Sequence, residues 1–158
     1  MLFRSGATAL AAALREHGLE TVLDAVFRRR LPLQDTVDAC RRHGGDEARL
    51  VVDLDRRYPL DPSVVVALLL HLVRLEPGEA LYLGPGNLHA YVSGLGVEVM
   101  GPSDNVVRGG LTTKHVDVDA LLSVVRPEPL DDPVVRAVAD APGVWRYPTP
   151  GAPFTVRR

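Results

Sequence analysis

The side chains best suited to chemistry gather in the segment from Glu79 to Leu122. A merely structural β-barrel would have little reason to interleave so many polar groups with its strands. Imidazole is a natural zinc ligand, a guanidinium lowers the energy of a developing oxyanion, and an ammonium binds anions. We therefore expect the functional groups to come from the polar residues of this segment, which are Asn87, His89, Tyr91, Glu98, Ser103, Asp104, Asn105, Arg108, Lys114 and His115.

Spacing alone leaves an ordinary structural explanation open for each main candidate. His89 can be a histidine satisfied inside a β core instead of a metal ligand. Tyr91 lies two residues further on, hence on the same face of a strand, where it lines a cavity or simply packs. Arg108 can be a surface arginine before a glycine pair, and Lys114 a solvated lysine. We expect Asp104 and its neighbours to form a turn that fixes the arginine loop.

The elements that position these residues differ between the two halves of the chain. From Thr8 to about Val73, apolar residues recur one helical turn apart, which predicts several short amphipathic helices. Breaks between these helices are expected at Gly18, Pro32, Gly44-Gly45 and Pro59. Asp61-Pro62 opens a fifth helix, because aspartate caps free amides and proline suits the first helical position. The run Val64 to Leu70 is apolar on all sides, which predicts a buried helix.

After Leu75 the pattern changes to short runs that are typical of strands. Turns rich in glycine, proline and asparagine divide them at nearly regular intervals, which favours a sandwich or barrel. The expected strands are Ala80–Leu83, His89–Val92, Val97–Met100 and Val106–Val107, followed by a short helix at Asp117–Val125. The tail carries too many prolines for regular structure, except edge strands near Val144–Tyr147 and Phe154–Val156. We expect an α+β fold, with a helical subdomain at residues 1–75 and a β-domain at residues 76–158.

Length and composition exclude several classes of protein. The chain has 158 residues, 46% of them hydrophobic, and a formal net charge of -2, so it carries no basic excess to bind nucleic acid. Its longest apolar run is far shorter than the roughly 20 residues of a membrane span, and we expect no membrane association and a cytoplasmic location. Cys40 lies at helical spacing from Leu33 and Val37, which favours a small buried hydrophobe over a nucleophile or metal ligand.

Residues 77–122, which read PGEALYLGPGNLHAYVSGLGVEVMGPSDNVVRGGLTTKHVDVDALL, resemble type I mannose-6-phosphate isomerases. The carboxy-terminal cupin segment of that family has a histidine-alanine-tyrosine step, then SDNV, an arginine, GGLT, and a lysine before H-DV. The resemblance implies a fold of paired jelly-roll cupin barrels with a helical domain attached. This chain would supply the helical part and a partial cupin barrel.

The resemblance also implies a function and roles for three residues. The family interconverts mannose 6-phosphate and fructose 6-phosphate, a zinc-dependent aldose-ketose isomerisation. His89 corresponds to a zinc-binding histidine and Arg108 to the arginine regarded as catalytic. Lys114 corresponds to a lysine that would contact the substrate phosphate. From its spacing after His89, and not from the resemblance, Tyr91 is expected to contact the substrate in the same cavity. Glu98 is expected to be structural or supporting, because the family draws its glutamate ligand from elsewhere.

Three of the four metal-binding groups of the family have no counterpart in the sequence. The family adds a glutamine and a histidine from an earlier strand and a later glutamate, but Gln34 is the one glutamine here and no histidine lies two positions after it. One imidazole cannot hold zinc tightly. We therefore expect an incomplete carboxy-terminal part, with an amino-terminal cupin half as its partner. The alternative is a non-catalytic cupin-like module that binds a sugar phosphate or another chain.

Overall fold

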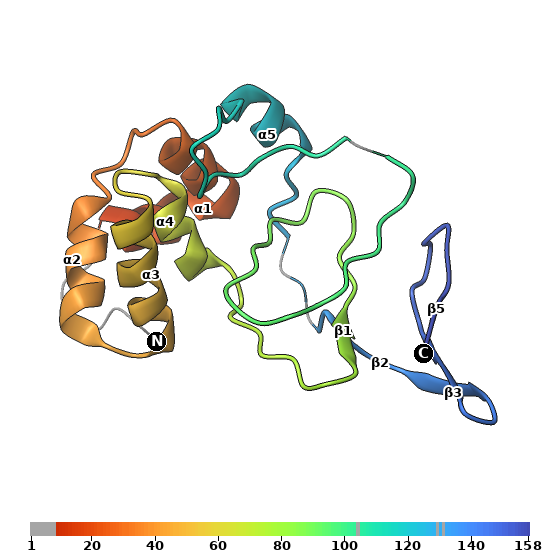
Figure 1. Ribbon diagram of the computed structural model, residues 1–158. Helices are drawn as coiled ribbons and strands as arrows, with labels where there is room; N and C mark the ends of the chain where they lie inside the picture. Colours follow the sequence, from red (N-terminus) through yellow and green to blue (C-terminus); the bar gives the residue numbers. More distant parts are fainter. Residues whose placement is uncertain (1–8, 104, 129, 131) are drawn as a thin grey trace. The chain divides into compact units, whose positions relative to one another are not determined.

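The chain divides into two units, which we call the helical unit and the β unit. The computed structural model describes residues 9–103, 105–128, 130 and 132–158 (Figure 1). The helical unit comprises the described residues up to Leu72 together with Val107–Pro127, and the β unit comprises Val73–Val106 and Glu128–Arg158. The expected mixture of helix and sheet is confirmed. The chain leaves the helical unit after Leu72 and returns to it for Val107–Pro127, so more than one boundary separates the units.

Short helices separated by glycine and proline build the helical unit, as the sequence predicts. Its described elements are α1 (Ala9–Phe27), α2 (Gln34–His43), α3 (Asp46–Arg57), α4 (Ser63–Val66), the 3-10 helix η1 (Ala67–Leu69) and α5 (Val118–Val124). Gly18 interrupts α1 with a non-helical φ of 77°. The helix expected over Val64 to Leu70 is shorter than predicted, because α4 gives way to η1 and Leu70 is extended.

The apolar core of the described residues lies entirely in the helical unit. Helix α5 joins this core through Leu121, which is 2% exposed, and Cys40 is buried as expected. Burial raises the pKa of the Cys40 thiol, which keeps it in its unreactive form. Asp117 caps α5, because its Oδ1 accepts a hydrogen bond of 2.9 Å from the Ala120 amide. The buried apolar residues are Leu10, Ala11, Val22, Leu23, Val26, Phe27, Val37, Cys40, Ala48, Val51, Val64, Val65, Val66 and Leu121.

Two small antiparallel sheets form the regular part of the β unit. One pairs β1 with β2, and the other has the order β3-β4-β5. Ala80 faces Val135 in the first sheet, and Ala139 faces Trp145 in the second. The strands are β1 (Glu79–Leu81), β2 (Val134–Arg136), β3 (Val138–Ala141), β4 (Val144–Tyr147) and β5 (Val156–Arg157).

Several strand predictions need correction. No strand forms at His89–Val92, Val97–Met100 or Val106–Val107, where the described backbone has no neighbouring strand with which to pair. Conversely, β2 and β3 form in the tail that was expected to lack strands there. Their prolines lie just outside the paired residues, at Pro133 and Pro142, where the missing N–H costs no ladder hydrogen bond. The strand at Val144–Tyr147 and the helix near Asp117–Val125 are confirmed.

No helix in the described part of the chain is both long enough and apolar enough to cross a membrane.

Replacing Leu121 by alanine tests whether α5 is part of the helical core. Because this side chain is 2% exposed, we expect Leu121→Ala to lower the free energy of unfolding by about 2–5 kcal/mol. Val124 lies in the same helix but is 47% exposed, and Val124→Ala should change the stability by less than about 0.5 kcal/mol. Urea unfolding followed by far-ultraviolet circular dichroism measures both. Equal losses would contradict the burial of α5.

Candidate functional site

The loop that carries Arg108 is fastened to the start of α4 by side chains of Asp61 and Ser63. Asp61 Oδ2 accepts a hydrogen bond of 2.8 Å from the Leu111 amide, and its Oδ1 accepts one of 2.9 Å from the Ser63 amide. The Ser63 hydroxyl donates to the Gly109 carbonyl at 2.6 Å. Hydrogen bonds to a charged acceptor are stronger than neutral ones. One carboxylate and one hydroxyl therefore fix the backbone of residues 109–111.

Gly110 is required at its position for two physical reasons. Its φ of 119° lies in a region that residues with a Cβ rarely adopt. A Cβ built there would also lie 2.5 Å from the Ser63 Cβ and nearly on the Ser63 hydroxyl. The glycine thus lets the loop approach α4 closely enough for the hydrogen bonds of Asp61 and Ser63 to form.

Arg108 and Lys114 present unpaired cations on this loop. Both side chains are exposed, and neither forms an ion pair with any described residue. The Lys114 amide donates to Thr112 Oγ1 at 3.1 Å, so the backbone before the lysine is held locally. Five other arginines of the same unit are paired with aspartates, namely Arg28, Arg30, Arg41, Arg49 and Arg56. The loop is therefore chemically able to bind an anion without first breaking an ion pair to a described residue.

One ring nitrogen of His89 is held by a hydrogen bond to the backbone. Its Nδ1 lies 3.0 Å from the Asn87 carbonyl oxygen. A carbonyl only accepts hydrogen bonds, so Nδ1 carries a proton, and in a neutral ring the lone pair is then on Nε2. The ring of Tyr91 meets the His89 ring edge-on, with 6.2 Å between centroids. One neutral imidazole nitrogen is thus available as a ligand.

The described residues do not provide a metal site by themselves. No three histidine, cysteine, aspartate or glutamate side chains among them come close enough to hold one ion. Zinc in a catalytic site takes three protein ligands, and His89 offers one nitrogen. The residues present therefore fit zinc as a single ligand and do not form its full coordination shell.

The structure groups the four predicted site residues in pairs. His89 and Tyr91 belong to the β unit, whereas Arg108 and Lys114 belong to the helical unit. A cavity common to all four stays a prediction. The Asn105 amide donates to Ser103 Oγ at 3.2 Å, while Asp104, which was expected to help form a turn before the arginine loop, lies outside the described residues.

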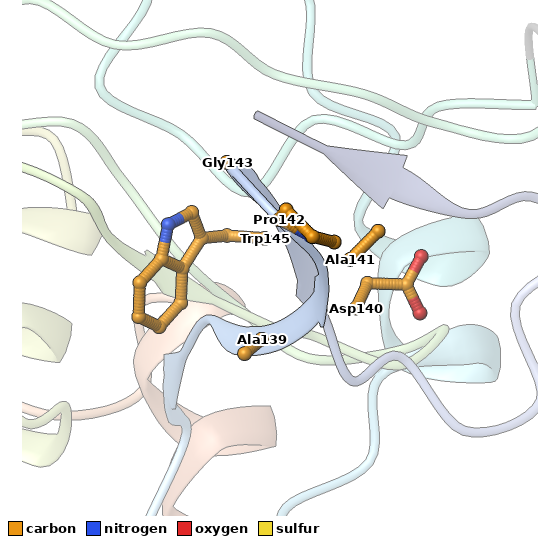
Figure 2. Close-up of a pocket in the computed structure, with 6 residues that line it drawn as sticks. All are labelled: Ala139, Asp140, Ala141, Pro142, Gly143 and Trp145. Carbon is orange, nitrogen blue, oxygen red and sulfur yellow. The ribbon is translucent and has the colours of Figure 1, made fainter.

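Two recesses in the described surface are lined by residues other than the predicted site residues. The recess in Figure 2 lies at the tip of the β3-β4 hairpin, where the Trp145 indole and the Asp140 carboxylate point to opposite sides. Arg157, with Arg146 beside it, holds the pKa of Asp140 below its usual value, because both cations favour the ionised carboxylate. A second recess between α2 and α3 is lined by Cys40, Arg41, Gly44, Arg49, Val52, Asp53 and Arg56. Neither recess offers an activated acid, base or nucleophile.

The contribution of Asp61 and Ser63 to the site was missed in the sequence. Asp61 was predicted to open a helix, and it does bind the Ser63 amide at the start of α4. Its second oxygen binds an amide 50 residues further along the chain, which local spacing cannot indicate. The one available signal was the glycine pair after Arg108, because adjacent glycines permit a close backbone approach.

Comparison with proteins of known sequence reveals relatives that share one name. The chain is 41% identical over 111 residues to mannose-6-phosphate isomerase 1 of Arabidopsis thaliana, a match that covers 70% of this chain and 26% of the relative. It is 41% identical over 85 residues to the mannose-6-phosphate isomerase of Salmonella typhimurium, covering 54% of this chain and 22% of the relative. The Escherichia coli protein of the same name is 38% identical over 96 residues. The chain matches no established protein-family profile.

Solved structures give the same result. The crystal structure of a variant of phosphomannose isomerase from Salmonella typhimurium aligns with a TM-score of 0.79 and 28% sequence identity. The alignment covers 92% of this chain and 40% of that chain. The chain thus spans about a quarter of the length of the first curated relative, where coverage is 26%, and two fifths of the solved one.

Alanine at position 110 should destabilise the helical unit more than alanine at another left-handed glycine. Gly45 also has a positive φ, 99°, but a Cβ there meets nothing within 4 Å. We expect Gly110→Ala to cost about 1–3 kcal/mol more than Gly45→Ala, because only Gly110→Ala adds overpacking to the backbone strain. Chemical denaturation followed by the helical signal compares the two variants. Equal costs would contradict the close approach of the loop to Ser63.

Neutralising Glu98 should make Tyr91 more acidic. Burial of part of the phenol and the neighbouring Glu98 carboxylate raise the pKa of Tyr91, since both disfavour the phenolate. Glu98→Gln removes the negative charge, so the pKa of Tyr91 should fall towards its ordinary value. Nuclear magnetic resonance titration of the tyrosine rings measures it, and Glu128→Gln, in the same unit, serves as the control. An unchanged pKa in Glu98→Gln would show that Glu98 does not act on this phenol.

Proposed function

This chain is homologous to mannose-6-phosphate isomerases over most of its own length, and we propose that it takes part in the interconversion of mannose 6-phosphate and fructose 6-phosphate. The observation that carries the proposal is the identity of 41% over 111 residues with a relative of that name. Since the chain covers 26% of that relative, the activity is proposed for a protein that contains this chain together with further sequence.

Arg108 and Lys114 supply the cationic part of the proposed site. Aldose-ketose isomerisation moves a proton between adjacent carbons through an enediolate, and a fixed guanidinium lowers the energy of its developing oxyanion. We assign this role to Arg108 and the binding of the substrate phosphate to Lys114. Support comes from their exposed, unpaired side chains on one hydrogen-bonded loop. Tyr91 is assigned to the wall of the substrate cavity.

His89 supplies one ligand for zinc in this proposal. The hydrogen bond of Nδ1 to the Asn87 carbonyl supports it, because this bond leaves Nε2 free to coordinate a metal. The remaining ligands would come from outside this chain, since the described residues contain no cluster of three ligand side chains. Bound zinc would supply Lewis-acid polarisation of the substrate oxygens.

The β unit is proposed to be a partial cupin barrel that an amino-terminal cupin half completes. Every buried apolar residue among those described belongs to the helical unit, so the β unit has no core of its own. Its strand-type segment also exposes large apolar side chains, which is typical of a surface that another element covers. These are Tyr91, Val92, Leu95, Val97, Val99, Met100 and Val106. A cytoplasmic location and the absence of nucleic-acid and membrane partners complete the proposal.

A second candidate function is a non-catalytic module that binds a sugar phosphate. The lack of a three-ligand metal cluster among the described residues favours it, while the free cations of Arg108 and Lys114 suit a phosphate in either case. The two functions differ in whether turnover appears once the missing cupin half is supplied.

Reconstitution distinguishes the two candidates. We expect the 158-residue chain alone to bind mannose 6-phosphate without converting it. Co-expression with the preceding part of a related mannose-6-phosphate isomerase should yield zinc-dependent formation of fructose 6-phosphate in a coupled assay. In that assembly Arg108→Ala should lower kcat by about 100- to 1000-fold, because it removes an oxyanion-stabilising group. Lys114→Ala should raise KM most.

The controls separate the roles of the residues. Arg126→Ala removes another exposed arginine of the helical unit and should leave kcat unchanged. His89→Ala should lower the zinc content without preventing phosphate binding by the isolated chain. Enzyme-like turnover by the 158-residue chain alone would contradict the need for outside ligands. An inactive assembly that still binds the sugar phosphate would favour the second function.

A further inference from the structure

Backbone strain in the helical unit is concentrated around Asp61. The described non-glycine residues with positive φ are Arg29 at 57°, Leu60 at 66° and Leu111 at 51°. Side chains other than glycine pay a steric penalty in this region, which is notable for leucine because it gains no compensating local hydrogen bond there. Such residues persist only where their surroundings hold them.

These three strained residues are linked by consecutive contacts. The Arg29 Nη1 donates a hydrogen bond of 2.7 Å to the Leu60 carbonyl. Leu60 directly precedes Asp61, whose Oδ2 accepts from the Leu111 amide at 2.8 Å. The guanidinium of Arg29 thus fixes the peptide before Asp61, and Asp61 fixes the strained residue of the loop.

Strain of this kind is often found where a fold holds functional groups in place. Leu111 lies three residues after Arg108 and three before Lys114, and neither of these cations forms an ion pair with a described residue. A buried side chain also holds this loop. Ser63 is 7% exposed, and its hydroxyl donates a hydrogen bond to the Gly109 carbonyl. The fixed part of the loop therefore lies midway between its two free cations.

We propose that Asp61 is a positioning residue, which holds the Gly109–Leu111 backbone so that Arg108 and Lys114 present a preformed site for a phosphorylated sugar. The inference rests on the proposed function for the nature of the ligand. It goes beyond that function by assigning the site's rigidity to a carboxylate that touches neither substrate nor metal. Preformed cations bind a ligand more tightly because no loop must be ordered on binding.

The first experiment tests, without any ligand, whether Asp61 holds the backbone amides of Ser63 and Leu111. In Asp61→Ala the amides of Ser63 and Leu111 both lose their acceptor, and their hydrogen exchange in the full 158-residue chain should become about tenfold faster. Asp61→Asn keeps one acceptor oxygen and should free one of the two amides. Asp53→Asn, an exposed aspartate of the same unit paired with Arg56, is the matched control and should leave both rates unchanged. Unchanged exchange in both Asp61 variants overturns the proposal.

The second experiment tests whether Asp61 acts through Lys114. Mannose 6-phosphate is titrated into the full chain and into Asp61→Asn, Lys114→Ala and the double variant, with binding followed by nuclear magnetic resonance. We expect Asp61→Asn to weaken binding about fivefold in the wild-type background and by less than about twofold in the Lys114→Ala background. Equal weakening in both backgrounds means that Asp61 merely stabilises the fold, and it overturns the positioning role.

The two experiments separate the inference from the proposed function. If Lys114→Ala binds the sugar phosphate as well as the wild type, or the wild type does not bind it, the proposed function fails. The exchange rates then still decide whether Asp61 holds the loop. If exchange becomes faster in the Asp61 variants and the binding losses are non-additive, both the proposed function and the positioning role of Asp61 are supported.

Discussion

The Asp61 carboxylate is the interaction on which the candidate site depends. Its two oxygens accept hydrogen bonds from the amide of Ser63, at the start of α4, and from the amide of Leu111, 50 residues further along the chain. Hydrogen bonds from two amides to a partly buried carboxylate stabilise the fold more than the same bonds would in water, because water competes less for the lone pairs of the carboxylate. Gly110 makes the contact possible, since a Cβ there would collide with Ser63.

This constraint explains why the arginine loop belongs to the helical unit although it follows the strand-like segment in sequence. The segment Val107–Pro127 returns to the helices, where Leu121 enters the apolar core and the loop is held by Asp61. The described buried apolar residues all lie in that unit. Rigidity for Arg108 and Lys114 is thus supplied by helical packing and not by a β-sheet.

The β unit, unlike the helical unit, contains none of the buried apolar residues among those described. Its short sheets are held by strand pairing and by hydrogen bonds such as that from the Tyr147 hydroxyl to the Gly78 carbonyl, at 2.8 Å. Large apolar side chains such as Leu95 and Val97 stay exposed in it. The chain covers 26% of the Arabidopsis relative, which agrees with the proposal that further sequence covers these residues.

Local chemistry in the sequence determined the helices, their glycine and proline breaks, the buried Cys40, and the segment that carries His89, Arg108 and Lys114. These features depend on periodicity and on residues close together in the chain, which a single sequence displays. The tertiary structure alone decided which strands formed, because a strand such as β2 needs a partner that lies 55 residues away at β1 in the register of Val135 with Ala80. It also decided that Asp61 holds the arginine loop, because a hydrogen bond between distant residues leaves no periodic trace in the sequence.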